Sequence, residues 1–396
     1  MKIFHHTDHD GICGGAILYN FFNYYIRYNY NNNTGVTYMS LPQGIISLET
    51  SNLFYENEMV LHANEDIQTF ATNYNAPVDH FINDTNMAPS CKNEAYVFVD
   101  LSINDVGFEA ICKILDAGCR VIWIDHHKSS NEYAGKIIEY INTHNNAQCR
   151  VIIDTNRSGA LLAWELTFNT CYNYTGCFHQ FNKNYPTYVE YVDDYDRWIY
   201  KYGDDTITFS LGYDTYEGHE DVKSEFHRRL IQSVVPELHH HPDFKFDDNK
   251  SIEFMEEIVN KGRLIKSYID SQNESMYRRY GFHSTIRIVN NETMEEKEFE
   301  VAAINRSSNS WIFGEDYDKY PAVIVFTFDP EKLIYKYSIY SNNKFEKDID
   351  CSEIAKLFCG GGHRGAAGFS CPKNIFTEAK IELDGYTIYI TTNRKK

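Results

Sequence analysis

The sequence of 396 residues lacks long apolar runs and closely paired cysteines. None of its apolar runs reaches the ~20 residues that a helix needs to span a bilayer, and the opening MKIFHHTDHD has no apolar core of a signal peptide. The ten cysteines include no Cys-x-x-Cys pair, so we expect reduced, packed thiols rather than a structural zinc site. These absences predict a cytoplasmic protein that does not bind a membrane.

Basic residues are also scarce. The chain holds 37 Lys and Arg against 56 Asp and Glu, which gives a formal net charge of -19 at pH 7. A protein that binds duplex nucleic acid presents a basic face to the phosphate backbone, so we expect no stable duplex binding. A small phosphate substrate is compatible with this charge, because bound divalent cations reverse the field locally.

Acidic and histidine clusters stand at the ends of short apolar runs. KIF leads into HHTDHDG, AYVFVDLS reaches Asp100, and RVIWIDHH reaches Asp125, His126 and His127. These runs alternate with segments whose apolar residues recur at helical spacing, which indicates a parallel sheet covered on both faces. Ligands of such sheets bind beyond the carboxyl ends of the strands, so we expect the three clusters at one edge. A single acid at a strand end is often only a helix cap, but three coincident clusters favour a shared function.

The length and the later segments predict two domains. A helical pattern begins near residue 251, and after it β-branched and aromatic runs such as PAVIVFTF predict strands. We therefore predict an α/β fold: a parallel-sheet domain with flanking helices at 1–250, a helical linker at 251–275 and a smaller mixed α/β domain at 276–396. The active site is expected in the cleft between the domains. The polar stretch 168–186 and the His triplet of ELHHHPDF are expected to be loops.

The residue types in the clusters favour metal chemistry. Carboxylates and imidazoles together suit Mn2+, Mg2+, Fe2+ or Zn2+. Six or more candidate ligands exceed the needs of one open site, and two cations that share an aspartate are the usual arrangement for hydrolysis of phosphate esters. The glycines of GGGHRGAAG would let backbone N–H groups approach an anion, with His363 and Arg364 beside them. The pattern predicts phosphate-ester hydrolysis and a phosphate-binding loop near the C-terminus.

Taken in order, these motifs resemble those of the DHH phosphoesterase superfamily. The motifs are His6-x-Asp8-x-Asp10-Gly11, Asp100, Asp125-His126-His127, DDYDRW and GGGHRGAAGF, of which the last resembles the DHH-associated C-terminal domain. Members of the superfamily include RecJ-like single-strand exonucleases, oligoribonucleases, cyclic dinucleotide phosphodiesterases and inorganic pyrophosphatases. The resemblance covers nearly the whole chain, and it disfavours a pyrophosphatase because the C-terminal domain of those enzymes lacks the GGGH motif.

The resemblance implies two divalent cations, with Mn2+ expected and Mg2+ as the alternative. It implies that His6 and Asp8 hold one cation, that Asp10 and His126 hold the other, and that Asp100 bridges them. Some relatives place the first histidine four positions before the first aspartate, where this chain has phenylalanine. His6 therefore serves under a shorter spacing, and the neighbouring His5 is the possible substitute.

The remaining roles that the resemblance implies concern VDDYDRW and the substrate contacts. We expect Asp194 to complete the second metal site, with Asp193 and Asp196 as alternatives. His127 would contact the substrate phosphate or assist the leaving oxygen, and Asp125 would orient the neighbouring imidazoles. Substrate contacts are expected from Ser158, which could equally be a simple N-cap, and from Gly360, Gly361, Gly362, His363 and Arg364.

The combined expectation is a divalent-metal-dependent phosphodiesterase that degrades short single-stranded RNA or DNA to mononucleotides. The acidic balance favours short substrates, since a long strand would need an extended basic track. A phosphodiesterase for cyclic dinucleotides or other signalling nucleotides uses the same centre and is the first alternative. The others are a non-catalytic nucleotide-binding protein and an assembly subunit whose cations only stabilise the fold. The sequence leaves a homodimer open.

Overall fold

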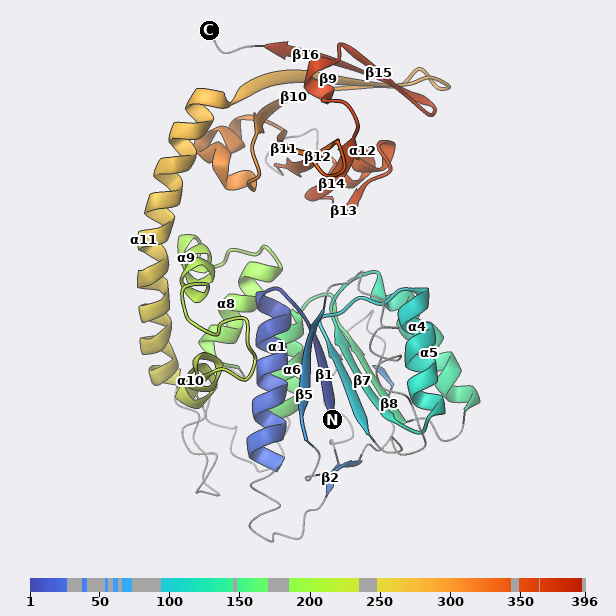
Figure 1. Ribbon diagram of the computed structural model, residues 1–396, viewed down its shortest axis with the longest axis vertical. Helices are drawn as coiled ribbons and strands as arrows, with labels where there is room; N and C mark the ends of the chain where they lie inside the picture. The colour runs from blue at the N-terminus through green and yellow to red at the C-terminus, as the bar shows by residue number, and fades with distance from the viewer. Residues whose placement is uncertain are drawn as a thin grey trace. The chain divides into compact units, whose positions relative to one another are not determined.

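The computed structural model describes most of the chain. The described residues are 1–26, 38–40, 54–55, 60–62, 66–72, 94–144, 148–169, 185–234, 248–342, 349–362 and 364–393. Most of 168–186 and of 43–93, the His triplet at 239–241, and His363 lie outside these ranges. The chain divides into two compact units, Met1–Ile265 and Lys266–Lys396 (Figure 1). None of the helices in the described ranges is both long and apolar enough to cross a membrane.

The first unit is built on five parallel strands with one short antiparallel strand at the edge (Figure 1). The strand order is β3-β8-β7-β6-β1-β5. β6 and β7 are buried along their whole length, as expected where helices cover both faces of a sheet, and this confirms the predicted α/β fold class. The strands are β1 (Lys2–His6), β3 (Phe54–Tyr55), β5 (Gln68–Thr72), β6 (Ala95–Val99), β7 (Arg120–Asp125) and β8 (Gln148–Ile153).

Helices cover both faces of this sheet. On one face α1 packs against α6, and on the other α4 lies beside α5 (Figure 1). Each face has its own apolar cluster, and Trp164 in the first and Trp123 in the second are fully buried. The helices are α1 (His9–Asn20), α4 (Asp105–Asp116), α5 (Ser130–Thr143) and α6 (Gly159–Trp164), and π-helical turns at Phe21–Ile26 and Glu165–Asn169 extend α1 and α6.

A second group of helices brings the acids of VDDYDRW to the sheet. α8 contacts α1, α6 and α9, and it begins directly after Pro186, whose fixed φ suits a helix start. The helices are α8 (Thr187–Asp196), α9 (Asp204–Tyr213) and α10 (Glu225–Val234), and a separate ribbon pairs β2 (Tyr38–Ser40) with β4 (Val60–His62).

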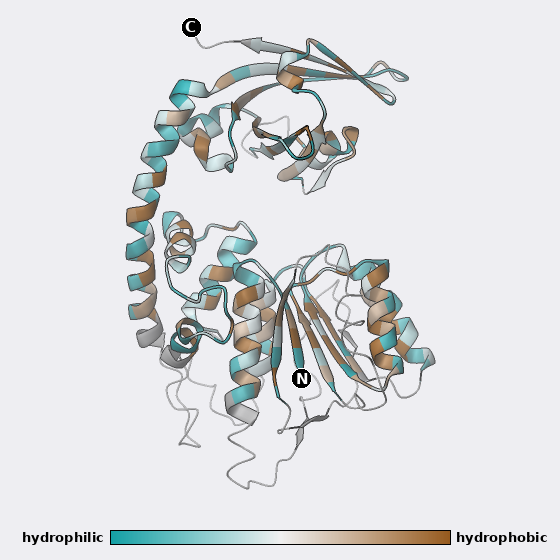
Figure 2. Ribbon diagram, in the orientation of Figure 1, coloured by the Kyte–Doolittle hydropathy of each residue, from teal (hydrophilic) through white to brown (hydrophobic). Residues whose placement is uncertain are grey.

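α11 (Asp248–Tyr280) is a single helix of 33 residues, and the boundary between the two units falls within it. It extends beyond the helical linker predicted at 251–275. Figure 2 shows that its residues are mostly polar with apolar ones between them. Such a pattern suits a helix that packs along only part of its surface. The predicted domain limits at 250 and 276 stay predictions.

The first half of α11 packs on α9 at very close range. Gly262 of α11 has no room for a side chain, because a Cβ there would lie 1.7 Å from the carbonyl oxygen of Thr208. Gly212 of α9 is equally confined, since its Cβ would lie 1.9 Å from the carbonyl oxygen of Ile258. The two glycines let the helix backbones touch, which no larger residue would allow.

The second unit is a mixed sheet of eight strands in the order β13-β14-β12-β11-β10-β9-β16-β15. β10 and β11 are parallel, and the other neighbours are antiparallel. The predicted smaller mixed domain is confirmed. Its elements are β9 (Phe282–Asn290), β10 (Glu296–Asn305), β11 (Ala322–Asp329), β12 (Ile334–Ser341), β13 (Gly361–Gly362), β14 (Ala366–Cys371), β15 (Lys380–Leu383), β16 (Tyr386–Asn393), α12 (Cys351–Leu357) and 3-10 turns at Ser310–Lys319 and Ile375–Thr377.

Replacing Gly262 by alanine should lower stability, although alanine favours helices. The added Cβ would overlap the Thr208 carbonyl and push α11 off α9, at a cost of about 1–3 kcal/mol in the free energy of unfolding. Gly135→Ala in α5 is the matched control, because a Cβ there meets nothing within 4 Å. It should raise the free energy of unfolding by about 0.4–1 kcal/mol. Chemical denaturation measures both, and a Gly262→Ala protein as stable as the wild type would contradict the close contact.

Candidate active site

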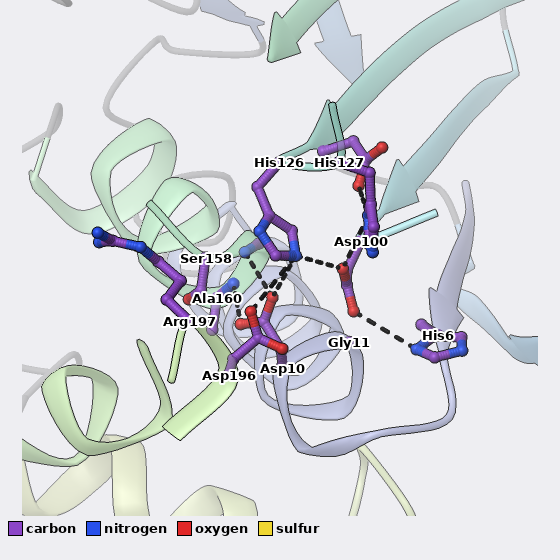
Figure 3. Close-up of polar contacts among 12 residues, drawn as sticks. His6, Asp10, Gly11, Asp100, His126, His127, Ser158, Ala160, Asp196 and Arg197 are labelled. Carbon is purple, nitrogen blue, oxygen red and sulfur yellow. Dashed lines mark hydrogen bonds and ion pairs between the residues drawn. The ribbon is translucent and has the colours of Figure 1, made fainter. Parts of the chain in front are cut away.

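Three strands of the first sheet deliver polar residues to one edge. His6 ends β1, Asp100 follows β6, and Asp125 ends β7 with His126 and His127 directly after it. Because parallel strands end at the same edge, these side chains meet although they are far apart in the sequence. The group of ligand-like side chains seen in Figure 3 consists of His6, Asp10, Asp100, His126, His127 and Asp196.

Asp100 lies at the centre of this group and is fully buried. Its Oδ2 is 3.6 Å from Nδ1 of His6, and its Oδ1 is 3.2 Å from Nε2 of His126. Its φ of 56° lies in the left-handed region, which residues other than glycine rarely adopt. Gly159 makes room for it, because a Cβ on Gly159 would lie only 2.8 Å from the Cβ of Asp100. Asp100 therefore faces two histidines with its two oxygens.

Asp8 joins His6 and Asp100 on one side of the group. Nδ1 of His6 lies 2.7 Å from Oδ2 of Asp8. The other oxygen of Asp8 accepts a hydrogen bond from the Gly11 N–H at 3.0 Å and so caps α1. His5, the alternative to His6, is buried with its Nδ1 2.8 Å from the carbonyl oxygen of His6, and it joins no group of ligand-like atoms in the described ranges. The geometry favours His6.

Asp10, His126 and Asp196 form the other side. Asp10 is held at the N-terminus of α6, where its oxygens accept hydrogen bonds from the N–H groups of Gly159 at 2.6 Å and Ala160 at 2.8 Å. The positive end of a helix favours a carboxylate there. Nε2 of His126 lies 3.7 Å from Asp10 Oδ2 and 3.4 Å from Asp196 Oδ2. Two carboxylates from different helices thus face one imidazole.

The three acids of VDDYDRW have different partners. Asp193 accepts a hydrogen bond from the N–H of Ser158 at 2.7 Å, and Asp194 accepts one from the N–H of Lys201 at 2.8 Å. Asp196 faces the group, and the structure therefore favours it over the expected Asp194, whose carboxylate is committed to the turn after α8. Helix periodicity is a sequence signal against Asp194, because it sets Asp194 on a different face from Asp193 and Asp196, but it does not choose between those two.

His127 lies beside the group in a fixed orientation. Its Nδ1 is 2.8 Å from Oδ1 of Asp125, and the other oxygen of Asp125 accepts a hydrogen bond from the hydroxyl of Ser130. Both Asp125 and Ser130 are fully buried. An imidazole whose one nitrogen is held by a carboxylate presents the other nitrogen to a ligand.

Burial and crowding perturb the ionisation of the group. Burial and the charge of Asp10 raise the pKa of Asp100 well above its usual range, and the same two causes raise the pKa of Asp196. Burial lowers the pKa of His6, but the nearby carboxylates of Asp100 and Asp8 outweigh it and raise that pKa to about 9. Crowded carboxylates in a buried site therefore favour positive charge nearby, either a proton or a cation.

Several atoms of the group suit a cation better than a protein partner. Both carboxylate oxygens of Asp100, Nε2 of His126 and Oδ2 of Asp196 are buried, and within the described part of the chain they form no hydrogen bond. A buried polar atom without a hydrogen bond costs about 1–3 kcal/mol, so such atoms need an explanation. Carboxylate oxygens and imidazole nitrogens together are ligands for divalent metals. The residues therefore fit divalent cations.

Ser158 has a capping role in this structure. Its side chain is fully buried, and the hydroxyl accepts a hydrogen bond from the N–H of Leu161 at 3.4 Å as the N-cap of α6. The structure favours this role over the expected contact with substrate.

The glycine-rich motif lies in the second unit. Gly360 packs tightly, because a Cβ on it would lie 2.3 Å from the carbonyl oxygen of Gly368, whereas a Cβ on Gly361 meets nothing within 4 Å. Arg364 is exposed, and His363 lies outside the described residues. Substrate binding by this motif, which includes Gly362, stays a prediction, as does an active site between the two units.

Known proteins share features with this chain. Residues 1–176 match the DHH family, N-terminal domain. Oligoribonuclease NrnB of Bacillus subtilis (strain 168) is 24% identical over 313 residues, which cover 76% of this chain and only 65% of that protein. The structure of a pGpG-specific phosphodiesterase, PggH from Vibrio cholerae, is similar with a TM-score of 0.36 at 13% identity, and covers 93% of this chain and 92% of that one. An exopolyphosphatase-related protein from Bacteroides fragilis gives a TM-score of 0.36 at 11% identity, over 94% and 87% of the two chains.

Asp196→Asn and Asp194→Asn should have different effects. Asp196→Asn removes a crowded carboxylate, so it should weaken Mn2+ binding by about tenfold or more while stability without metal stays equal or rises. Asp194→Asn deprives the N–H of Lys201 of its charged acceptor and should lower the free energy of unfolding by about 1–3 kcal/mol. Calorimetric titration with Mn2+ and denaturation in chelator measure the two quantities. If the Asp194→Asn protein lost Mn2+ binding and the Asp196→Asn protein did not, Asp194 would be the ligand instead of Asp196.

Proposed function

Because residues 1–176 form a DHH family N-terminal domain, we propose that the protein is a divalent-metal-dependent phosphodiesterase. In this proposal it hydrolyses short single-stranded oligonucleotides to mononucleotides. The observation that carries the proposal is the buried group around Asp100, whose two oxygens face two separate sets of ligand-like atoms. Such a group suits two cations that share one carboxylate, an arrangement used for phosphate-ester hydrolysis.

The two sets of side chains define how the cations would be held. Asp100 is shared, and Mn2+ is the preferred ion with Mg2+ as the alternative. Bound cations would supply Lewis acidity toward water and the phosphoryl oxygens. The proposed ligands are His6, Asp8 and Asp100 for one cation, and Asp10, His126 and Asp100 with Asp196 for the other.

His127 is proposed to act on the leaving group. Asp125 holds Nδ1 of His127, and Ser130 holds Asp125, so the ring offers Nε2 in a fixed orientation. A protonated Nε2 can donate its proton to the departing oxygen of a nucleotide, which is a poor leaving group as an alkoxide. Asp125 orients the ring through its contact with Nδ1, and we assign the proposed reaction to His127, Asp125 and Asp100.

The proposed substrate class is supported by a relative and by charge. NrnB, with which 313 residues align, is named an oligoribonuclease. The net charge of -19 disfavours a long strand, which would need an extended basic track, and so favours short substrates. In the second unit, Gly360 to Gly362 and Arg364 would offer N–H groups and a guanidinium to the phosphate, with His363 beside them.

Product analysis with Mn2+ and a substrate panel tests this proposal. The panel contains labelled dinucleotides, longer RNA and DNA strands, cyclic dinucleotides and pyrophosphate. We expect mononucleotides, released fastest from dinucleotides, and no turnover after chelation or in a folded Asp100→Asn protein. Turnover confined to cyclic dinucleotides would move the protein to signalling nucleotides, and undiminished activity of Asp100→Asn would contradict the shared-carboxylate site.

The role of His127 is tested by changing the leaving group. His127→Asn should lower kcat for a dinucleotide by about a hundredfold, the usual contribution of a general acid. It should lower kcat far less for a 4-nitrophenyl phosphodiester, whose leaving group needs no proton. His144→Asn is the matched control, because His144 is an exposed histidine at the end of α5 and should not affect either substrate. Equal losses on both substrates in His127→Asn would argue against proton donation.

A further inference from the structure

The turn after α8 places a tryptophan where the backbone favours glycine. Trp198 has a φ of 56°, in the left-handed region. Its N–H donates to the carbonyl of Tyr195 at 3.1 Å, and the N–H of Ile199 donates to the carbonyl of Asp194 at 3.0 Å. These two bonds end the helix as in a Schellman motif, whose left-handed position is usually glycine. A residue with a Cβ at this position strains the turn.

The Trp198 side chain contributes little to the stability of the fold that would offset this strain. The side chain is 54% exposed. Its indole forms no hydrogen bond and no ring contact in the portion of the protein that the structure describes. Strain that no packing offsets is typical of positions that serve binding or catalysis. A ligand that contacts the indole would account for a tryptophan at this position.

The turn that carries Trp198 is anchored to the candidate active site. Two residues earlier, Asp196 lies 3.4 Å from His126 in the proposed metal site. Arg197, between them, bonds to Asp193 at 3.1 Å, and Figure 3 shows its guanidinium directed away from His126. The backbone of this turn is thus held on the same helix end as a proposed metal ligand. A substrate with its phosphate at the metal site would have its neighbouring groups close to this turn.

We propose that Trp198 stacks on a base of the substrate and so selects nucleotides over phosphates that carry no base. The inference rests on the proposed function and deepens it. A planar, exposed indole suits a nucleobase because every base has a π-face, and such stacking strengthens binding by about 5- to 100-fold per base. Stacking also supplies affinity that does not depend on basic residues, which suits a chain with a net charge of -19.

The test combines two kinds of substrate with variants of Trp198. The substrates are a dinucleotide and its two abasic versions, each lacking one base, and kcat/KM is measured for each. In Trp198→Gly, the ratio of kcat/KM for the intact dinucleotide to that for one abasic version should fall about tenfold. Trp198→Phe, which keeps a stacking ring, should preserve most of the ratio. The Tm of Trp198→Gly should rise by about 2–4 °C, because glycine relieves the left-handed strain.

Leu333→Gly is the matched control. Leu333 also has a left-handed φ, of 53°, and is 68% exposed, but it lies in the turn between β11 and β12. The change should raise the Tm in the same way and leave the substrate ratio unchanged. An unchanged ratio in Trp198→Gly, or a lower Tm, would overturn the stacking role while the proposed function stands. Failure of the wild type to hydrolyse any dinucleotide would instead refute the proposed function.

Discussion

Repulsion among four crowded carboxylates, of which Asp10 and Asp100 are fully buried, is the constraint on which the first unit depends. Without compensation, the four could not all be ionised at such close range. The fold supplies part of the compensation through N–H groups at the starts of α1 and α6 and through the imidazole of His6. Divalent cations would supply the rest. Without cations the crowded carboxylates lower the stability of the fold, and the same carboxylates would bind the cations. The four carboxylates belong to Asp8, Asp10, Asp100 and Asp196.

The surrounding framework exists to hold these acids close. Asp100 adopts a left-handed backbone, and Gly159 leaves the space that it needs. Asp193 and Asp194 do not face the group but fix the start of α6 and the turn after α8 by accepting backbone hydrogen bonds. Only one carboxylate of this acidic segment then faces His126. The left-handed Trp198 continues the pattern, since strain again lies next to a proposed ligand.

Charge is unevenly distributed along the chain, and this matters for an anionic substrate. Residues 1–265 carry nearly all of the net negative charge, whereas residues 266–396 are close to neutral. The first unit by itself would repel a phosphate, and bound cations would reverse the field only at the edge of the sheet. Affinity beyond that point must come from uncharged contacts or from the second unit. The sources that we propose are stacking on Trp198 and contacts with the glycine-rich motif.

The sequence by itself determined the two units and the convergence of the main clusters. Strands buried on both faces appear as continuous apolar runs, and parallel strands end at one edge, so His6, Asp100 and His126 could be predicted to meet. Only the tertiary structure decided which acid of the segment after Pro186 joins them. That choice depends on which carboxylates are taken by N–H groups of α6 and of the turn after α8, and these contacts form only once the helices have packed. The contact of α9 with α11 likewise joins two backbones that no local pattern relates.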